Sequence, residues 1–141
     1  MNNYFECTIK YSKVQQNGQV KKVSEKYLVD SLSFTEAEAK IIKESQSFIS
    51  GEFNVSDIKR SKVSEVFDAN EGDKYYDFKL AFITIDEKSA KEKKTFSHIL
   101  VLGDDIDGAK IYLDERMKGT LSDYVVDTIK ETKIVDVYIN Q

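Results

Sequence analysis

The sequence predicts an α+β protein built from two tandem, pseudo-symmetric ββαβ repeats, with antiparallel sheets and two helices. The first observation is that residues 55–67, VSDIKRSKVSEVF, closely match residues 126–138, VDTIKETKIVDVY, about half a chain length later. The second is that Tyr4-Phe5-Glu6 matches Tyr75-Tyr76-Asp77 at the same spacing. The third is that each half has two alternating segments, one helical segment and a final strand. A duplicated supersecondary unit explains all three observations.

The chain length favours one domain that contains both repeats. A chain of 141 residues is the usual size of a single domain, here residues 1–141. Repeat one covers about 1–70 and repeat two about 71–141. The sequence has no proline and no glycine-rich or serine-rich linker, so the polar segment 68–73 is the expected joint between the repeats.

Two strands are expected at the start of the first repeat. Apolar and polar residues alternate over 4–14, which is typical of a half-buried strand. Asn17-Gly18 follows, a strong signal for a tight hairpin turn. A second strand is therefore predicted over about 20–30.

A change of period then predicts a helix over about 34–48. Ser33 is the expected N-cap, and Glu36 stands three residues later, as in a capping box. After the helix, one long strand is predicted from Glu52 to Phe67, with a bulge near Asp57.

The second repeat shows the same order of elements. Residues 76–82 alternate, and a second strand ends in the apolar run 99–102. Gly103-Asp104-Asp105 precedes a predicted helix over about 105–117, where the aspartates would act as caps. A final strand reaches the C-terminus. Two sheets could join edge to edge or stack with the helices outside, and the pattern does not choose between them.

Composition narrows the range of functions. The chain carries 21 basic and 25 acidic residues, for a net charge of −4. A protein that coats nucleic acid needs a basic face, so this class is disfavoured. No segment is apolar enough to cross a membrane, and the N-terminus lacks the features of a signal peptide, which predicts a cytoplasmic protein.

No motif predicts an enzyme, a metal site or a cofactor. Zinc-type Cys or His pairs, a phosphate-binding loop and a nucleophile elbow are all missing from the sequence. Cys7 occupies an apolar position of a predicted strand, where a small buried side chain is expected. The only histidine, His98, lies in another apolar strand, so a Cys–His nucleophile is not supported.

Paired aromatic and basic residues are the strongest candidates for a ligand site. In each predicted first strand one member of the aromatic pair faces the core, and Tyr4 or Tyr75 would face outward. Lysines recur at equivalent positions in the two matching segments. Aromatic rings that stack on bases and lysines that pair with phosphates would form a nucleotide pocket. The predicted ligand-binding residues are Tyr4, Tyr75, Lys59, Lys62, Lys130 and Lys133.

A structural interpretation of the same residues also exists. Cross-strand packing explains the aromatic rings, and solvated side chains explain the lysines. The basic runs Lys21-Lys22 and 91–94 are equally suited to protecting a sheet edge or to binding phosphate.

Several segments together resemble a known family. They are YFECTIKY, YLVDSLSFTEAEAKII, ISGEFNVSDIK, FITIDEKS, MKGT and DVY. The chain is similar over nearly its whole length to a domain-of-unknown-function family of short proteins from Bacteroidales and from their phages and mobile elements. The resemblance implies a small cytoplasmic protein that travels with phage-like genomes. Because small phage proteins often act by binding, it favours sequestration of a host immune signal such as a cyclic nucleotide.

Three functions are therefore weighed. The first is non-enzymatic sequestration of a nucleotide-like anion by a homo-oligomer. The second is a protein–protein interaction module that binds a host factor or inhibits a defence protein. The third is a single-stranded nucleic-acid binder that uses a sheet face, which the acidic balance disfavours.

Overall fold

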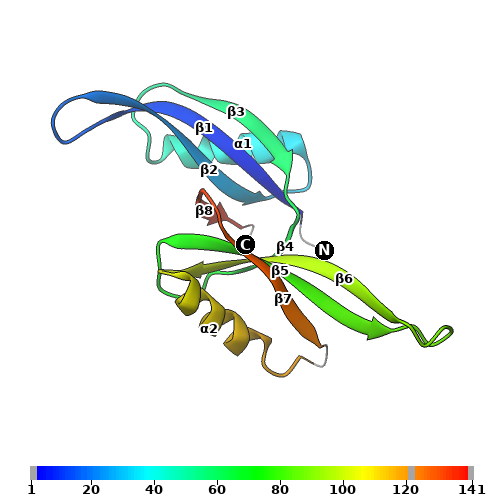
Figure 1. The fold of residues 1–141 in the computed structure, drawn as a ribbon. Helices are drawn as coiled ribbons and strands as arrows, with labels where there is room; N and C mark the ends of the chain where they lie inside the picture. The colour runs from blue at the N-terminus through cyan, green and yellow to red at the C-terminus, as the bar shows by residue number, and fades with distance from the viewer. Residues whose placement is uncertain (1–2, 121–122, 140–141) are drawn as a thin grey trace. The chain divides into compact units, whose positions relative to one another are not determined.

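The chain folds into two compact units, each with one four-stranded sheet and one helix (Figure 1). The computed structural model describes residues 3–120 and 123–139. Unit 1 comprises the residues up to Ser61 together with those from Lys133 onward, and unit 2 comprises Lys62–Thr132. The predicted α+β class and the tandem repeats are confirmed. The single domain remains a prediction.

In unit 1 the strand order is β3-β1-β2-β8. Strands β1 (Tyr4–Val14) and β2 (Val20–Asp30) form the predicted antiparallel hairpin, and Gly18 adopts a positive φ of 83° in its turn. Strand β3 (Phe53–Arg60) pairs with the other edge of β1. Strand β8 (Ile134–Tyr138) pairs in parallel with β2.

Helix α1 (Phe34–Gln46) covers one face of this sheet. Its buried side chains pack on the inward-facing residues of β1, which include Phe5 and Ile9, to form the core of unit 1. Burying such apolar side chains is the main contribution to the stability of a unit of this size. The opposite face of the sheet has no helix in unit 1.

Unit 2 has the equivalent architecture, with the strand order β4-β6-β5-β7. Strands β5 (Lys74–Ile85) and β6 (Glu92–Gly103) form the hairpin, and α2 (Ile106–Met117) packs against β6. Strand β7 (Tyr124–Glu131) lies beside β5, and β4 (Val63–Phe67) pairs in parallel with β6.

The last strand of each repeat belongs to the sheet of the other repeat. Repeat one supplies β4 to unit 2, and repeat two supplies β8 to unit 1. The predicted long strand over 52–67 is therefore wrong, because β3 ends at Arg60 and β4 begins at Val63 in a different sheet. The sheets are antiparallel as predicted, except for these two exchanged strands, which pair in parallel.

The length of the connection keeps β4 away from β2 of its own sheet. The edge of β2 that β8 occupies lies three strand spacings, or about 14 Å, from β3. The link Ser61-Lys62 spans at most about 11 Å between Arg60 and Val63. Strand β4 therefore cannot reach that edge, and the same limit applies to β8 after Thr132-Lys133.

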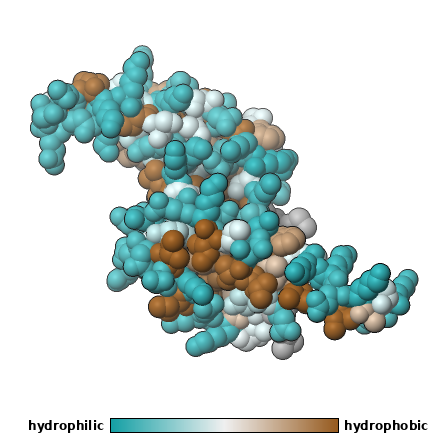
Figure 2. Space-filling model, in the orientation of Figure 1, coloured by the Kyte–Doolittle hydropathy of each residue, from teal (hydrophilic) through white to brown (hydrophobic). Residues whose placement is uncertain are grey.

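Polar residues dominate the visible surface, while apolar residues gather mainly over the unit that contains β5 and β7 (Figure 2). This distribution agrees with a mean hydropathy of −0.46. Within the described part of the chain, no helix is both long enough and apolar enough to cross a membrane.

Candidate functional site

A charged cluster lies on the helix-free face of unit 1. Side chains at alternate positions of β1 point away from α1, and Glu6 is one of them. Its carboxylate pairs with Lys26 Nζ of β2 at 3.2 Å and lies 3.9 Å from Lys59 Nζ of β3. An acid on the central strand is thus flanked by a cation on each neighbouring strand.

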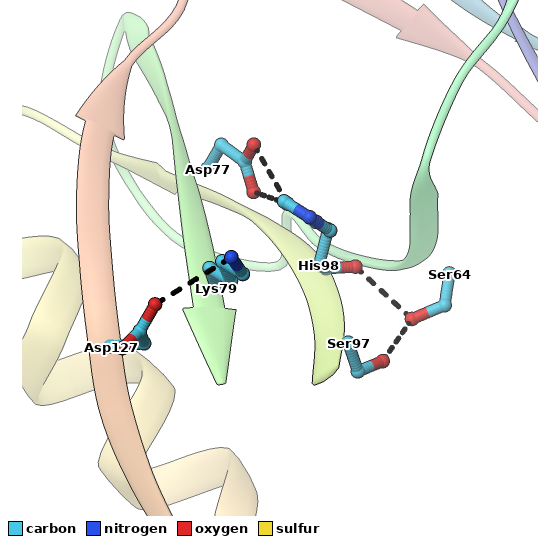
Figure 3. Close-up of polar contacts among 6 residues, drawn as sticks. All are labelled: Ser64, Asp77, Lys79, Ser97, His98 and Asp127. Carbon is cyan, nitrogen blue, oxygen red and sulfur yellow. Dashed lines mark hydrogen bonds and ion pairs between the residues drawn. The ribbon is translucent and has the colours of Figure 1, made fainter. Parts of the chain in front are cut away.

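Unit 2 repeats this arrangement with a histidine in one position. Asp77 takes the place of Glu6, and both of its carboxylate oxygens lie 3.0 Å from Nδ1 of His98 (Figure 3). Because a carboxylate accepts, Nδ1 is the donor of this hydrogen bond. Lys130 is paired in register with Asp77, as Lys59 is with Glu6.

Within the described part of the chain, no hydroxyl or thiol group hydrogen-bonds to the side chains of the Asp77–His98 pair. Ser64 and Ser97 share a 2.7 Å hydrogen bond, and Ser64 Oγ donates to the backbone carbonyl of His98 rather than to its ring (Figure 3). Cys7 is fully buried, and burial, followed by the charges of Glu6 and Asp57, raises the pKa of its thiol to about 12. A thiol in this state is a poor nucleophile.

The predicted exposure of Tyr4 and Tyr75 to solvent is wrong. Their exposed fractions are 4% and 6%. Alternation predicted one exposed residue in each aromatic pair, but this end of the sheet is buried on both faces, as the adjacent residues Leu28 and Val29 of β2 also show. Neither ring is available for stacking on a base in this structure, and their role in ligand binding remains a prediction.

The four predicted lysines are all exposed, but they are divided between the units. Lys59 and Lys133 belong to unit 1, whereas Lys62 and Lys130 belong to unit 2. Lys59 lies within ion-pair distance of Glu6. The strand exchange therefore assigns Lys59 and Lys62, which are only three residues apart in the sequence, to different units.

A groove of about 580 Å³ lies in unit 1 across β2, β1 and the start of β3. Lys10 and Lys22 contribute cations, and no ion pair within the described part of the chain engages either of them. The other lining residues add hydroxyl, amide, carboxylate and aromatic groups: Tyr11, Ser12, Val23, Ser24, Glu52, Phe53 and Asn54.

The hairpin around this groove is basic in an acidic protein. Residues 10–24 contain four lysines and no Asp or Glu, whereas the whole chain has a net charge of −4. Lys10 is paired with Ser24 and Asn54, and Ser12 with Lys22, so these side chains share the helix-free face. Lys13 and Lys21 are paired on the opposite face.

A second groove of about 430 Å³ lies between the first turn of α1 and strand β3. Phe34, Val55 and Ile58 contribute apolar surface, and Glu38 and Asp57 contribute carboxyl groups. Two carboxyl groups make this groove less suitable for an anion than the groove beside Lys10 and Lys22.

The second repeat provides an internal comparison for the groove at Lys10. Structurally equivalent strand positions carry Ala81 in place of Lys10, Phe96 in place of Ser24 and Val125 in place of Asn54. Both units form the same sheet around the same kind of core. The polar residues of the groove are therefore not required by the fold.

Residues 3–141 match a family model described as Domain of unknown function (DUF4494). The chain belongs to this family. No match was found among the curated proteins or among the solved structures. The predicted resemblance to a domain-of-unknown-function family is confirmed. The description of this family names no functional residues that could be assigned to the chain.

Sequence analysis of this DUF4494 chain missed the groove residues. Lys22 was considered only as part of a basic run, and Lys10 only as a polar position of a strand. A signal was present, because four lysines without an acid are uncommon in a protein with this balance of charge.

Among the described residues, no group of three or more His, Cys, Asp and Glu side chains could hold a metal ion.

Proposed function

We propose that this DUF4494 protein is a non-enzymatic binding protein that holds a phosphate-bearing, nucleotide-like ligand in the groove beside Lys10 and Lys22. The volume of about 580 Å³ is within the range of small-molecule sites. Two ammonium groups without an ion-pair partner among the described residues suit phosphate oxygens, and the polar groups of Ser12, Ser24 and Asn54 suit the hydrogen-bonding edges of a nucleotide.

The observation that carries this proposal is the difference between the repeats. A residue that only maintains the sheet should be interchangeable with its equivalent in the other unit. Instead, unit 1 has one cation and two hydrogen-bonding groups, Lys10, Ser24 and Asn54, where unit 2 has Ala81, Phe96 and Val125. The second cation, Lys22, is matched by Lys94 of unit 2. Sequestration of a nucleotide-like immune signal, which stays chemically unchanged, is the activity that we propose for this site.

The first test compares two double variants in a binding assay with cyclic di- and trinucleotides. Lys10→Ala with Lys22→Ala removes both cations of the groove, and Lys13→Ala with Lys21→Ala removes the same charge from the opposite face of the same hairpin. Each charge-assisted contact contributes about 1.5–3 kcal/mol, so we expect the first variant to bind about 100-fold more weakly or worse. The control should change affinity by less than about threefold.

Thermal denaturation and mass analysis complete this test. A ligand at about 100 times its dissociation constant should stabilise the protein by roughly 2.7 kcal/mol. Equal losses in both double variants would show that the hairpin attracts anions only through its overall charge. Recovery of a hydrolysed ligand would contradict a non-enzymatic function.

Two alternatives keep specific support. The lysine-rich hairpin also suits single-stranded nucleic acid, which would predict a steep decrease of affinity with salt and equal contributions from Lys13 and Lys21. Strands β3, β4, β7 and β8 are the sheet edges, and such edges suit a protein–protein interaction module. Co-purification of one protein without any effect of nucleotides would favour the second alternative.

A further inference from the structure

Unit 2 has an apolar patch on its helix-free face, at the positions that form the groove in unit 1. The patch contains Phe96 of β6 and Val125 of β7, with exposed fractions of 53% and 51%. Ala81 lies between them on the central strand, paired in register with both, and Ile83 follows on the same face. This inference is independent of the ligand groove in unit 1.

The repeat shows that the fold does not need these apolar residues. Unit 1 has Lys10, Ser12, Ser24 and Asn54 at the four equivalent positions and still forms the same sheet. Exposed aromatic and β-branched side chains that do not stabilise a core usually belong to an interaction surface. The patch therefore points to a partner.

Charged residues around the patch indicate which partner fits it. Lys79 Nζ lies 4.6 Å from the centroid of the Phe96 ring and 3.7 Å from a carboxylate oxygen of Asp127. On the helix-free face, the strands of unit 2 carry three cationic and three acidic side chains: Lys79, Lys94, Lys130, Asp77, Glu92 and Asp127. A strongly acidic partner would repel the three carboxylates, and a strongly basic partner would repel the three lysines.

We infer that this patch is a self-association surface that binds the same patch of a second copy of this chain. In a two-fold interface the same patch of each copy faces the other, so the lysines of one copy can pair with the carboxylates of the other. Phe96 and Val125 would form its apolar centre, and the lysines and carboxylates would form the rim.

Analytical ultracentrifugation of the full chain over a range of concentrations tests this inference. We expect a species with twice the 16.2 kDa mass of one chain. The test variant Phe96→Ser with Val125→Asn introduces the residues that unit 1 carries at these positions. Loss of two central apolar side chains should weaken the dimer by roughly 30-fold or more.

The control variant is Val14→Ser, which removes an apolar residue that is 69% exposed at the hairpin tip of unit 1. It should dimerise like the unchanged protein. Val125→Lys is a second test variant, because a cation near the two-fold axis would face its own copy and prevent association. Thermal melts confirm that each variant is folded. A monomeric unchanged protein, or dimers that persist in both folded test variants, would overturn the inference.

Discussion

At the level of single residues, three tyrosine hydroxyls near Glu25 have raised pKa values. The Glu25 carboxylate accepts hydrogen bonds from Tyr11 at 2.8 Å and from Tyr27 at 3.0 Å. Burial and then this carboxylate raise the pKa of Tyr11 from 10.0 to about 12. Burial and the same carboxylate raise the pKa of Tyr27, while burial and then Asp136 raise that of Tyr138 to about 12.

These shifts predict a loss of stability at alkaline pH. A raised pKa means that the folded state holds the proton more tightly than the unfolded state, so the stabilisation is complete below pH 10. It is lost as the pH rises from 10 to about 12, when the unfolded tyrosines ionise first. Urea unfolding between about pH 9 and 12 should show this decline, and Tyr11→Phe should make it shallower. A parallel decline in Tyr11→Phe would contradict the assignment to Tyr11.

Sequence patterns predicted burial correctly for residues on the core-facing side of a strand, but not for residues on the opposite side. Cys7 was expected in the core because it alternates with polar residues, and it is buried. Tyr4 and Tyr75 were expected to face solvent by the same rule, and both are buried. Alternation identifies opposite faces of a strand, but it contains no information about what covers the second face.

At the level of elements, the two helices begin at side-chain caps that are equivalent in the two repeats. Ser33 Oγ accepts a hydrogen bond of 3.1 Å from the backbone N–H of Glu36, and Asp105 Oδ1 accepts one of 2.7 Å from that of Gly108. Only one of the two hydrogen bonds of the predicted capping box forms, the one that Ser33 Oγ accepts from Glu36. The backbone N–H of Ser33 donates to Ser31 Oγ at 3.4 Å instead of to the Glu36 side chain. Each cap satisfies a backbone donor that would otherwise lack a partner in the helix.

Removal of either cap should therefore destabilise its helix. Ser33→Ala and Asp105→Ala should each lower the free energy of unfolding by about 1 kcal/mol, measured by chemical denaturation. Ser33→Asp keeps an acceptor at the same position and is the matched control. Equal stability of Ser33→Ala and Ser33→Asp would show that the cap of α1 contributes nothing.

Elements were predictable where their signals are local. The capping residues predicted both helix starts correctly, and the bulge near Asp57 is present, since Val55 and Asp57 pair with adjacent residues of β1. The break after Arg60 was missed. The residues across it, 59–62, are all polar and include no proline or glycine, so no turn residue marks the end of β3.

At the level of the whole molecule, the exchange of β4 and β8 is the feature that sequence analysis did not predict. The two strands were recognised as equivalent, because VSEVF matches IVDVY. Their registers are equivalent as well: Phe67 pairs with Val101 as Tyr138 pairs with Val29. Local patterns place a strand in the sequence but do not say which sheet it joins. The connection length, compared with the width of the sheet, excludes β4 only from the edge of β2 in its own sheet.

This comparison predicts the behaviour of an isolated half of the chain. Residues 1–70 contain β1, β2, α1, β3 and β4, but the sheet of unit 1 lacks its fourth strand and the link before β4 is too short to supply it. Strand β4 of one copy can pair with β2 of another, because it is equivalent to β8. We expect residues 1–70 to form a dimer with two exchanged strands, measured by light scattering after gel filtration.

A longer link provides the decisive comparison. About eight glycine and serine residues inserted between Ser61 and Lys62 extend the reach to about 40 Å, enough for β4 to return to β2 of its own copy. The lengthened half should therefore become monomeric, while the unchanged half remains dimeric, because only the reach of the link differs between them. A folded monomer without the insertion would show that the short link does not force the exchange.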